Sequence, residues 1–293
     1  MPKLIPLANQ LSQKLSQIEK EILKLIEAST IKEFRNDPFS SVFFISPPYY
    51  WGETDENQKR IQMEIKMIYI PWIESFRLLF KNASLEVKKQ IDQTDIAIIS
   101  YVEKNADWGL PATIEEAKIQ FKNKIKTFYD LLRMVEDKNR RALIIVPDTN
   151  VLITSPDIAK YSEVVGETQY TVMLVPTVLS ELDKLKITGR EKEFRDKVTS
   201  VINRIKGLRL QGSLLEGVKV NKTITVKMIP IEPNFTNNLH WLDPANNDDR
   251  IIASTLEIQR LDPSAIVTLM TSDINLQNKA EMANLPFVEP PGA

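Results

Sequence analysis

The chain has 293 residues, of which 43% are hydrophobic and 26% charged, a composition typical of a globular protein with one large or two medium domains. It contains no cysteine and a single histidine, His240, which excludes disulfides and thiolate zinc sites and disfavours a histidine-rich metal cage. Any metal must therefore be held mainly by oxygen ligands, which favours Mg²⁺ or Mn²⁺. The net charge of −1 gives no global case for nucleic-acid binding, so that case has to be local.

Neither membrane insertion nor secretion is expected from the sequence. No stretch approaches the roughly 20 apolar residues that a membrane span needs. The start, Met1-Pro2-Lys3-Leu4-Ile5, lacks the apolar core of a secretory signal. We therefore expect a cytoplasmic protein.

The first part of the chain has the apolar periodicity of helices. Apolar residues recur every three to four positions from Leu11 to Ile26, which predicts one helix. Longer helices are predicted over residues 58–80 and 114–135, and Pro71 should kink or split the first of these two. This pattern predicts a mainly helical N-terminal domain.

An aromatic and proline-rich segment lies between the first two predicted helices. Its rings could stack on nucleic-acid bases. The more common use of such side chains is to fill a core or a domain interface. The segment comprises Phe43, Phe44, Pro47, Pro48, Tyr49, Tyr50 and Trp51.

The charge-rich residues 136–141 are predicted to form a domain boundary, because strands alternate with helices after them. We expect a helical domain of unassigned role over residues 1–140 and an α/β domain over 141–293, with a mainly parallel sheet between helices. The predicted strands cover residues 142–146, 171–175, 223–229, 266–270 and 287–288. The predicted helices cover residues 176–186, 190–208, 248–261 and 273–283.

Acidic residues follow several of these strands or lie in the next helix. Asp148 stands where the apolar run from Ala142 to Pro147 ends, and Glu181, Asp249 and Asp273 occupy comparable positions. Ligands of open α/β sheets bind at the carboxyl ends of the strands. Each acid alone could be a helix cap, an Asx-turn or half of a surface ion pair. Their joint placement suggests a divalent-metal site.

Helical geometry separates only some of the neighbouring acids. Asp249 is aligned with the apolar face of its helix and should point inward, whereas Asp248 fits better as an N-terminal cap or a supporting residue. A carboxylate on an apolar face needs a basic partner, a cap or a metal. The same test does not choose between Glu181 and Asp183.

The ordered motifs resemble those of PIN-domain nucleases. The motifs are Asp148-Thr149-Asn150, Ser180-Glu181-Leu182, Asn247-Asp248-Asp249-Arg250-Ile251-Ile252-Ala253 and Thr271-Ser272-Asp273. The resemblance covers about half the chain and implies a PIN-like α/β fold. It implies that Asp148, Glu181, Asp249 and Asp273 bind metal, and it favours Glu181 over Asp183. Thr149, Asn150 and Ser272 match the small polar positions that accompany these acids.

The implied activity is metal-dependent hydrolysis of phosphodiester bonds, with single-stranded RNA favoured by the resemblance and DNA not excluded. Two alternatives stay open. One is a haloacid-dehalogenase-like phosphatase, which would need an aspartate where Asn150 stands. The other is a non-catalytic nucleic-acid-binding or scaffold protein with the same fold. The helical first part departs from the compact toxins of the family, and whether an antitoxin-like partner exists is left open.

A local case for RNA binding comes from the segment between Lys184 and Arg209, whose basic residues outnumber its acidic ones. An apolar stripe beneath these charges fits an ordinary solvated helix face equally well. If the segment faces the substrate, Arg190, Lys192 and Arg195 are the expected phosphate contacts.

Overall fold

The computed structural model describes residues 5–34, 47–81, 83–105, 109–135, 142–189, 191–235 and 239–292. The chain divides into two compact units, one of residues Leu11–Val135 and one of Met1–Gln10 with Glu136–Ala293. The boundary expected at residues 136–141 lies outside the described residues, so the division at residue 140 stays a prediction. In the described part of the chain, no helix is both long and apolar enough to cross a bilayer.

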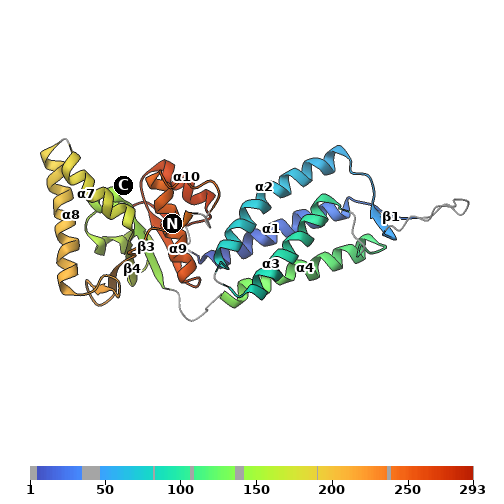
Figure 1. Cartoon of the computed structure of the whole chain (residues 1–293), viewed down its shortest axis with the longest axis horizontal. Helices are drawn as coiled ribbons and strands as arrows, with labels where there is room; N and C mark the ends of the chain where they lie inside the picture. The colour runs from blue at the N-terminus through green and yellow to red at the C-terminus, as the bar shows by residue number, and fades with distance from the viewer. Residues whose placement is uncertain are drawn as a thin grey trace, which may run out of the picture. The chain divides into compact units, whose positions relative to one another are not determined.

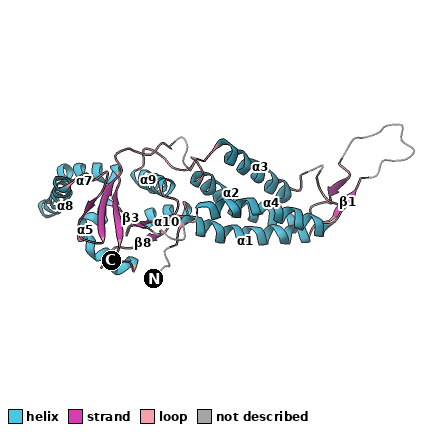
Figure 2. Cartoon of the chain, turned by 90° about the horizontal axis from the view of Figure 1, so that it is seen from below, coloured by secondary structure: helices cyan, strands magenta, loops and turns pink. Residues whose placement is uncertain are grey.

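The first unit is built on long helices with a small antiparallel ribbon at one end (Figures 1 and 2). The helices predicted in this region are present, together with one that the periodicity did not reveal, α3. The helices are α1 (Leu7–Glu27), α2 (Glu56–Leu79), α3 (Leu85–Glu103) and α4 (Ile114–Val135). The ribbon pairs β1 (Ile31–Glu33) with β2 (Tyr49–Trp51).

Pro71 was predicted to kink or split this helix; α2 runs through Pro71 as one helix, so a split is wrong. Proline removes the N–H that would bond to the carbonyl four residues earlier. Both Pro71 and Met67, which carries that carbonyl, are exposed, so water can satisfy the unbonded group. On the buried side, Trp72 stacks on Phe76, and its indole N–H donates to the Leu11 carbonyl at 2.8 Å. Packing on that side therefore holds the helix together.

The aromatic segment is used for packing where the structure describes it. Trp51 is 9% exposed, and its ring meets that of Tyr101 edge to face, with the ring centroids 6.0 Å apart. Tyr50, its neighbour on the strand, is 40% exposed. Phe43 and Phe44 lie outside the described residues. The Trp51 indole is thus a core residue of the ribbon and not a free stacking platform.

The second unit contains a six-stranded sheet in the order β5-β6-β4-β3-β7-β8. All neighbouring strands are parallel except β5 and β6. Every residue of β3 is buried, as expected for a parallel strand covered by helices on both faces. The fold is therefore the predicted α/β sheet between helices. Its strands are β3 (Leu143–Pro147), β4 (Tyr170–Leu174), β5 (Val218–Lys219), β6 (Ile224–Met228), β7 (Ile266–Met270) and β8 (Phe287–Val288).

The helices of this unit follow the strands in alternation (Figure 1). The four longer helices were predicted to within a few residues at each end. The short elements after β3 were not predicted. The helices are α5 (Thr149–Thr154), η1 (Ile158–Tyr161), α6 (Ser162–Val165), α7 (Pro176–Thr188), α8 (Lys192–Gln211), α9 (Asn247–Leu261) and α10 (Ile274–Met282).

The strand order reverses at β3. From β3 the chain proceeds to β4 and β6 on one side, and it later returns to place β7 and β8 on the other. Such a switch point opens a crevice at the carboxyl ends of the two strands. The pairing of β3 with β7 is continued by the Asp148 N–H, which donates to the Met270 carbonyl at 3.0 Å. Residues that follow β3 and β7 are consequently neighbours.

Replacement of Trp72 by alanine should destabilise the helical unit by about 3–5 kcal/mol, because it removes a fully buried ring and the indole N–H that donates to the Leu11 carbonyl. The matched control on the same helix is Met67→Ala, where the side chain is 75% exposed and the effect should stay within about 0.5 kcal/mol. Urea unfolding followed by circular dichroism measures both. Equal effects would contradict this account of the core.

Candidate functional site

A cavity of about 300 Å³ lies at the switch point and is lined by three carboxylates. Asp148 follows β3, Asp273 follows β7, and Glu181 projects from α7. Three of the four predicted acids are therefore brought together, while Asp249, Asp248 and Ser272 do not line the cavity. The remaining lining residues are Thr149, Asn150, Lys184, Leu185, Thr188, Asn247, Ile251 and Leu276.

Asp148 is the most deeply buried of the three, with 4% of its surface exposed. One carboxylate oxygen accepts from the Val151 N–H at 2.7 Å and so caps α5, and the other accepts from the Thr271 hydroxyl. Burial raises the pKa of Asp148, and the negative charge of Asp273 raises it further, while these two hydrogen bonds lower it. Asp148 is thus a carboxylate whose charge is unfavourable in the folded protein.

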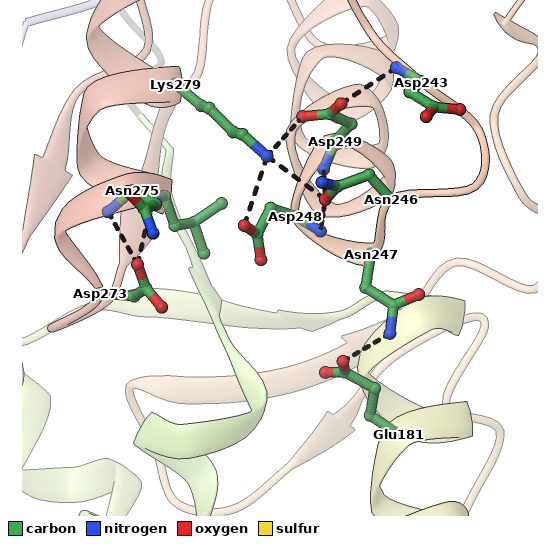
Figure 3. Close-up of polar contacts among 10 residues, drawn as sticks. Glu181, Asp243, Asn246, Asn247, Asp248, Asp249, Asp273, Asn275 and Lys279 are labelled. Carbon is green, nitrogen blue, oxygen red and sulfur yellow. Dashed lines mark hydrogen bonds and ion pairs between the residues drawn. The ribbon is translucent and has the colours of Figure 1, made fainter.

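Glu181 faces the cavity, whereas Asp183 on the same helix is exposed. The structure thereby separates two acids that helical geometry alone left equivalent. One oxygen of Glu181 accepts from the Thr149 hydroxyl. The other accepts from the Asn247 side-chain amide at 2.6 Å, as Figure 3 shows. The carboxylate is held from both α5 and α9.

Asp273 caps α10 by accepting from the backbone N–H groups of Asn275 at 2.7 Å and Leu276 at 3.2 Å (Figure 3). The small polar residue that reaches the acidic cluster is Thr271, which is fully buried. Ser272, the position that the family resemblance favoured, is exposed.

Asp249 is 5% exposed, as its helical position predicted, and Asp248 is more exposed. The Asp249 carboxylate forms an ion pair with Lys279 at 2.8 Å and accepts from the Asp243 N–H at 3.0 Å. The same lysine also bonds to Asp248 at 3.3 Å, so its ammonium lies between the two carboxylates (Figure 3). Burial lowers the pKa of Lys279, but the two aspartates outweigh that effect and raise it.

The donor set at the cavity fits a hard divalent cation, because all three acids present carboxylate oxygens and the chain contains no cysteine. Each carboxylate oxygen that already accepts one hydrogen bond retains capacity for a second interaction. Among the described residues, no group of three acids or histidines stands close enough to enclose an ion. This open arrangement suits Mg²⁺, which keeps several of its waters and binds through one or two carboxylates.

The three basic residues predicted to contact phosphate differ in what the structure shows. Arg190 lies outside the described residues. Lys192 is exposed at the start of α8. The Arg195 guanidinium donates to the Gly189 carbonyl at 2.7 Å, so part of its donor capacity closes the turn between α7 and α8.

Sequence reasoning missed the roles of three residues that shape the site: Thr271, Asn247 and Lys279. Thr271 and Asn247 stand inside recognised motifs, so their hydrogen-bonding side chains were the available signal. The contact of Lys279 with the aspartates of α9 spans about 30 residues of sequence. No local pattern indicates such a pair.

Comparison with known proteins identifies the class of this unit. The family model of the PIN domain matches residues 145–289, and the C-terminal half of the chain belongs to that family, which is of nuclease type. A curated relative is the human "Transcriptional protein SWT1", which is 31% identical over 144 residues. The matched stretch covers 47% of this chain and 15% of the human protein.

Asp148→Asn should stabilise the metal-free protein at neutral pH. Burial raises the folded-state pKa of Asp148 above its ordinary value of 3.8. The protonated carboxyl group therefore stabilises the folded protein at low pH, and this contribution is lost as the pH rises through the folded-state pKa. Asparagine stays neutral and can still cap α5. In EDTA, the variant should therefore show the higher Tm at about pH 7, and the difference should vanish below about pH 4. A Tm equal to wild type at neutral pH would contradict this assignment.

Lys279→Met should destabilise the protein because it leaves the buried Asp249 carboxylate without its cation. Breaking a buried pair costs roughly 3–5 kcal/mol, and the low end applies because the lysine side chain is 22% exposed. The double variant Lys279→Met/Asp249→Asn should regain most of the loss, since asparagine can still accept from the Asp243 N–H. A double-mutant cycle by urea unfolding measures the coupling. Additive losses would show that the pair is not coupled.

Proposed function

We propose that the PIN domain is a divalent-metal-dependent endonuclease that hydrolyses phosphodiester bonds in single-stranded RNA. The observation that carries this proposal is the meeting of three carboxylates from separate segments, Asp148, Glu181 and Asp273, at one cavity. Like charges repel in a partly buried site, so such a cluster is typical of cation binding. Membership of the nuclease-type PIN family supports the same class of reaction.

One or two of the three cavity carboxylates would bind the Mg²⁺ or Mn²⁺ directly, and the others would face the waters that the ion keeps. We keep Asp249 as the fourth acid of the proposed set, although Lys279 binds it in this structure. A divalent ion at such a site lowers the pKa of a bound water and stabilises charge on the phosphate oxygens. No protein nucleophile is needed for that chemistry, which agrees with the absence of cysteine from the chain.

The protein's own contribution is to orient carboxylates that would otherwise repel one another. Thr271 and the Val151 N–H fix Asp148, and Thr149 and Asn247 fix Glu181. The two hydrogen bonds to Asp148 favour its charged form. We propose supporting roles for Thr149, Asn150, Asp248 and Ser272 around the four acids.

RNA as the substrate rests on the family and on local charge. The description of the human relative as a transcriptional protein is in keeping with a nucleic-acid substrate. A cavity of about 300 Å³ has room for one phosphodiester group and its immediate neighbours. Arg190, Lys192 and Arg195 are the proposed contacts to the flanking phosphates.

Asp148→Asn and Asp273→Asn should each lower Mn²⁺-dependent cleavage of a labelled single-stranded RNA by at least about 100-fold, since even residues that only support metal ligands cost 10–100-fold. Glu181→Gln should do the same. Its matched control is Asp183→Asn, because Asp183 lies two residues further along α7 and is exposed. Cleavage rates with Mn²⁺ and with EDTA provide the measurement.

The outcomes separate the alternatives. Near-normal cleavage by any of the three variants removes that residue from the mechanism. Binding of RNA without cleavage by the wild type would favour a non-catalytic role. Hydrolysis of a phosphomonoester in a parallel assay, without cleavage of RNA, would favour a phosphatase. Equal cleavage of matched DNA and RNA strands would overturn the choice of RNA.

A further inference from the structure

One face of α7 forms a wall of the cavity. Glu181, Lys184, Leu185 and Thr188 all line it, and their spacing of three, four and seven residues from Glu181 is that of a single helix face. Helix α7 therefore places an acid and, about one turn further along, a base on the same side of the cavity.

Lys184 is the basic member of a lining that includes three carboxylates. Its side chain is exposed, and in the part of the chain that the structure describes it has no recorded ion pair. An ion pair with Glu181, three residues earlier, would be the ordinary surface arrangement. In this structure the two oxygens of Glu181 accept hydrogen bonds from Thr149 and Asn247 instead.

A polyanion approaching this cavity meets repulsion from the acids. An ammonium at the same wall offsets part of that repulsion, and the compact, flexible head of a lysine suits one phosphate without a fixed bonding geometry. Contacts to phosphate position a nucleic acid but carry no sequence information. A lysine placed here would thus raise affinity for any strand entering the acidic centre.

We infer that Lys184 binds a backbone phosphate of the nucleic acid next to the acidic centre, and so positions the strand over Asp148, Glu181 and Asp273. This inference rests on the proposed nuclease function. It assigns the substrate contact nearest the acids to α7, in addition to the basic residues proposed around the start of α8.

The test compares Lys184→Gln with Lys222→Gln in the full chain. Lys222 is exposed in the turn that leads into β6, at the amino end of that strand. Because β6 is parallel to β4, this turn lies at the edge of the sheet opposite to the cavity, which is at the carboxyl ends of the strands. Both variants lose one charge. Binding of a labelled single-stranded RNA is measured in EDTA across a salt series, so that no cleavage is required.

Loss of one phosphate contact reduces the salt slope of log affinity by about 0.7 for a single strand. Lys184→Gln should show this change. Taking equal affinities at 1 M salt as the reference, a slope difference of about 0.7 makes the variant bind about eightfold more weakly than the wild type at 50 mM salt. Lys222→Gln should match the wild type. Lys184→Arg should restore the slope. In cleavage assays Lys184→Gln should raise KM more than it lowers kcat.

The results distinguish this inference from the function on which it rests. If the wild type binds RNA but cleaves nothing, the nuclease proposal fails while the salt series still decides the role of Lys184. An unchanged slope in Lys184→Gln, or equal changes in the Lys184 and Lys222 variants, overturns the inference. Failure of the wild type to bind any oligonucleotide overturns it as well.

Discussion

The buried carboxylate of Asp148 is the constraint around which the α/β unit is arranged. Asp148 is placed at the end of the central strand, where β3 and β7 part, and its N–H continues their pairing. A charge in this position is unfavourable, so it requires a cap from α5 and a hydroxyl from Thr271. Those two donors come from segments 120 residues apart in sequence, which only the parallel sheet brings together.

Each acid at the site has a structural partner as well as a proposed chemical role. Asp148 and Asp273 cap helices, Glu181 bonds to α5 and α9, and Asp249 pairs with Lys279. These interactions offset the mutual repulsion of carboxylates in a protein that contains no histidine at the site. The structural and the proposed catalytic role of a strand-end acid are therefore compatible, and the sequence could not choose between them because one carboxylate can serve both.

The sequence predicted those parts of the fold that depend on local pattern. The bounds of β7 and α4 agree with the predictions because an apolar run and a three-to-four repeat mark them fully. Strand β5, with two residues, is defined only by its antiparallel partner. At the site, the acids were visible because they follow strands. Thr271 and Lys279 were missed because their roles come from tertiary contacts with Asp148 and with Asp248 and Asp249.

The position of Asp249 shows what helical periodicity can and cannot say. It predicted correctly that Asp249 points inward, since the residue is 5% exposed. Helix α9 is buried over much of its circumference, so an inward carboxylate has several buried partners available, and here it meets Lys279 instead of the cavity. If Asp249 also joins the metal site, as proposed, the ion competes with Lys279 for one carboxylate. Occupancy of the site would then be linked to the contact between α9 and α10, because an ion that took the Asp249 carboxylate would displace Lys279 from it.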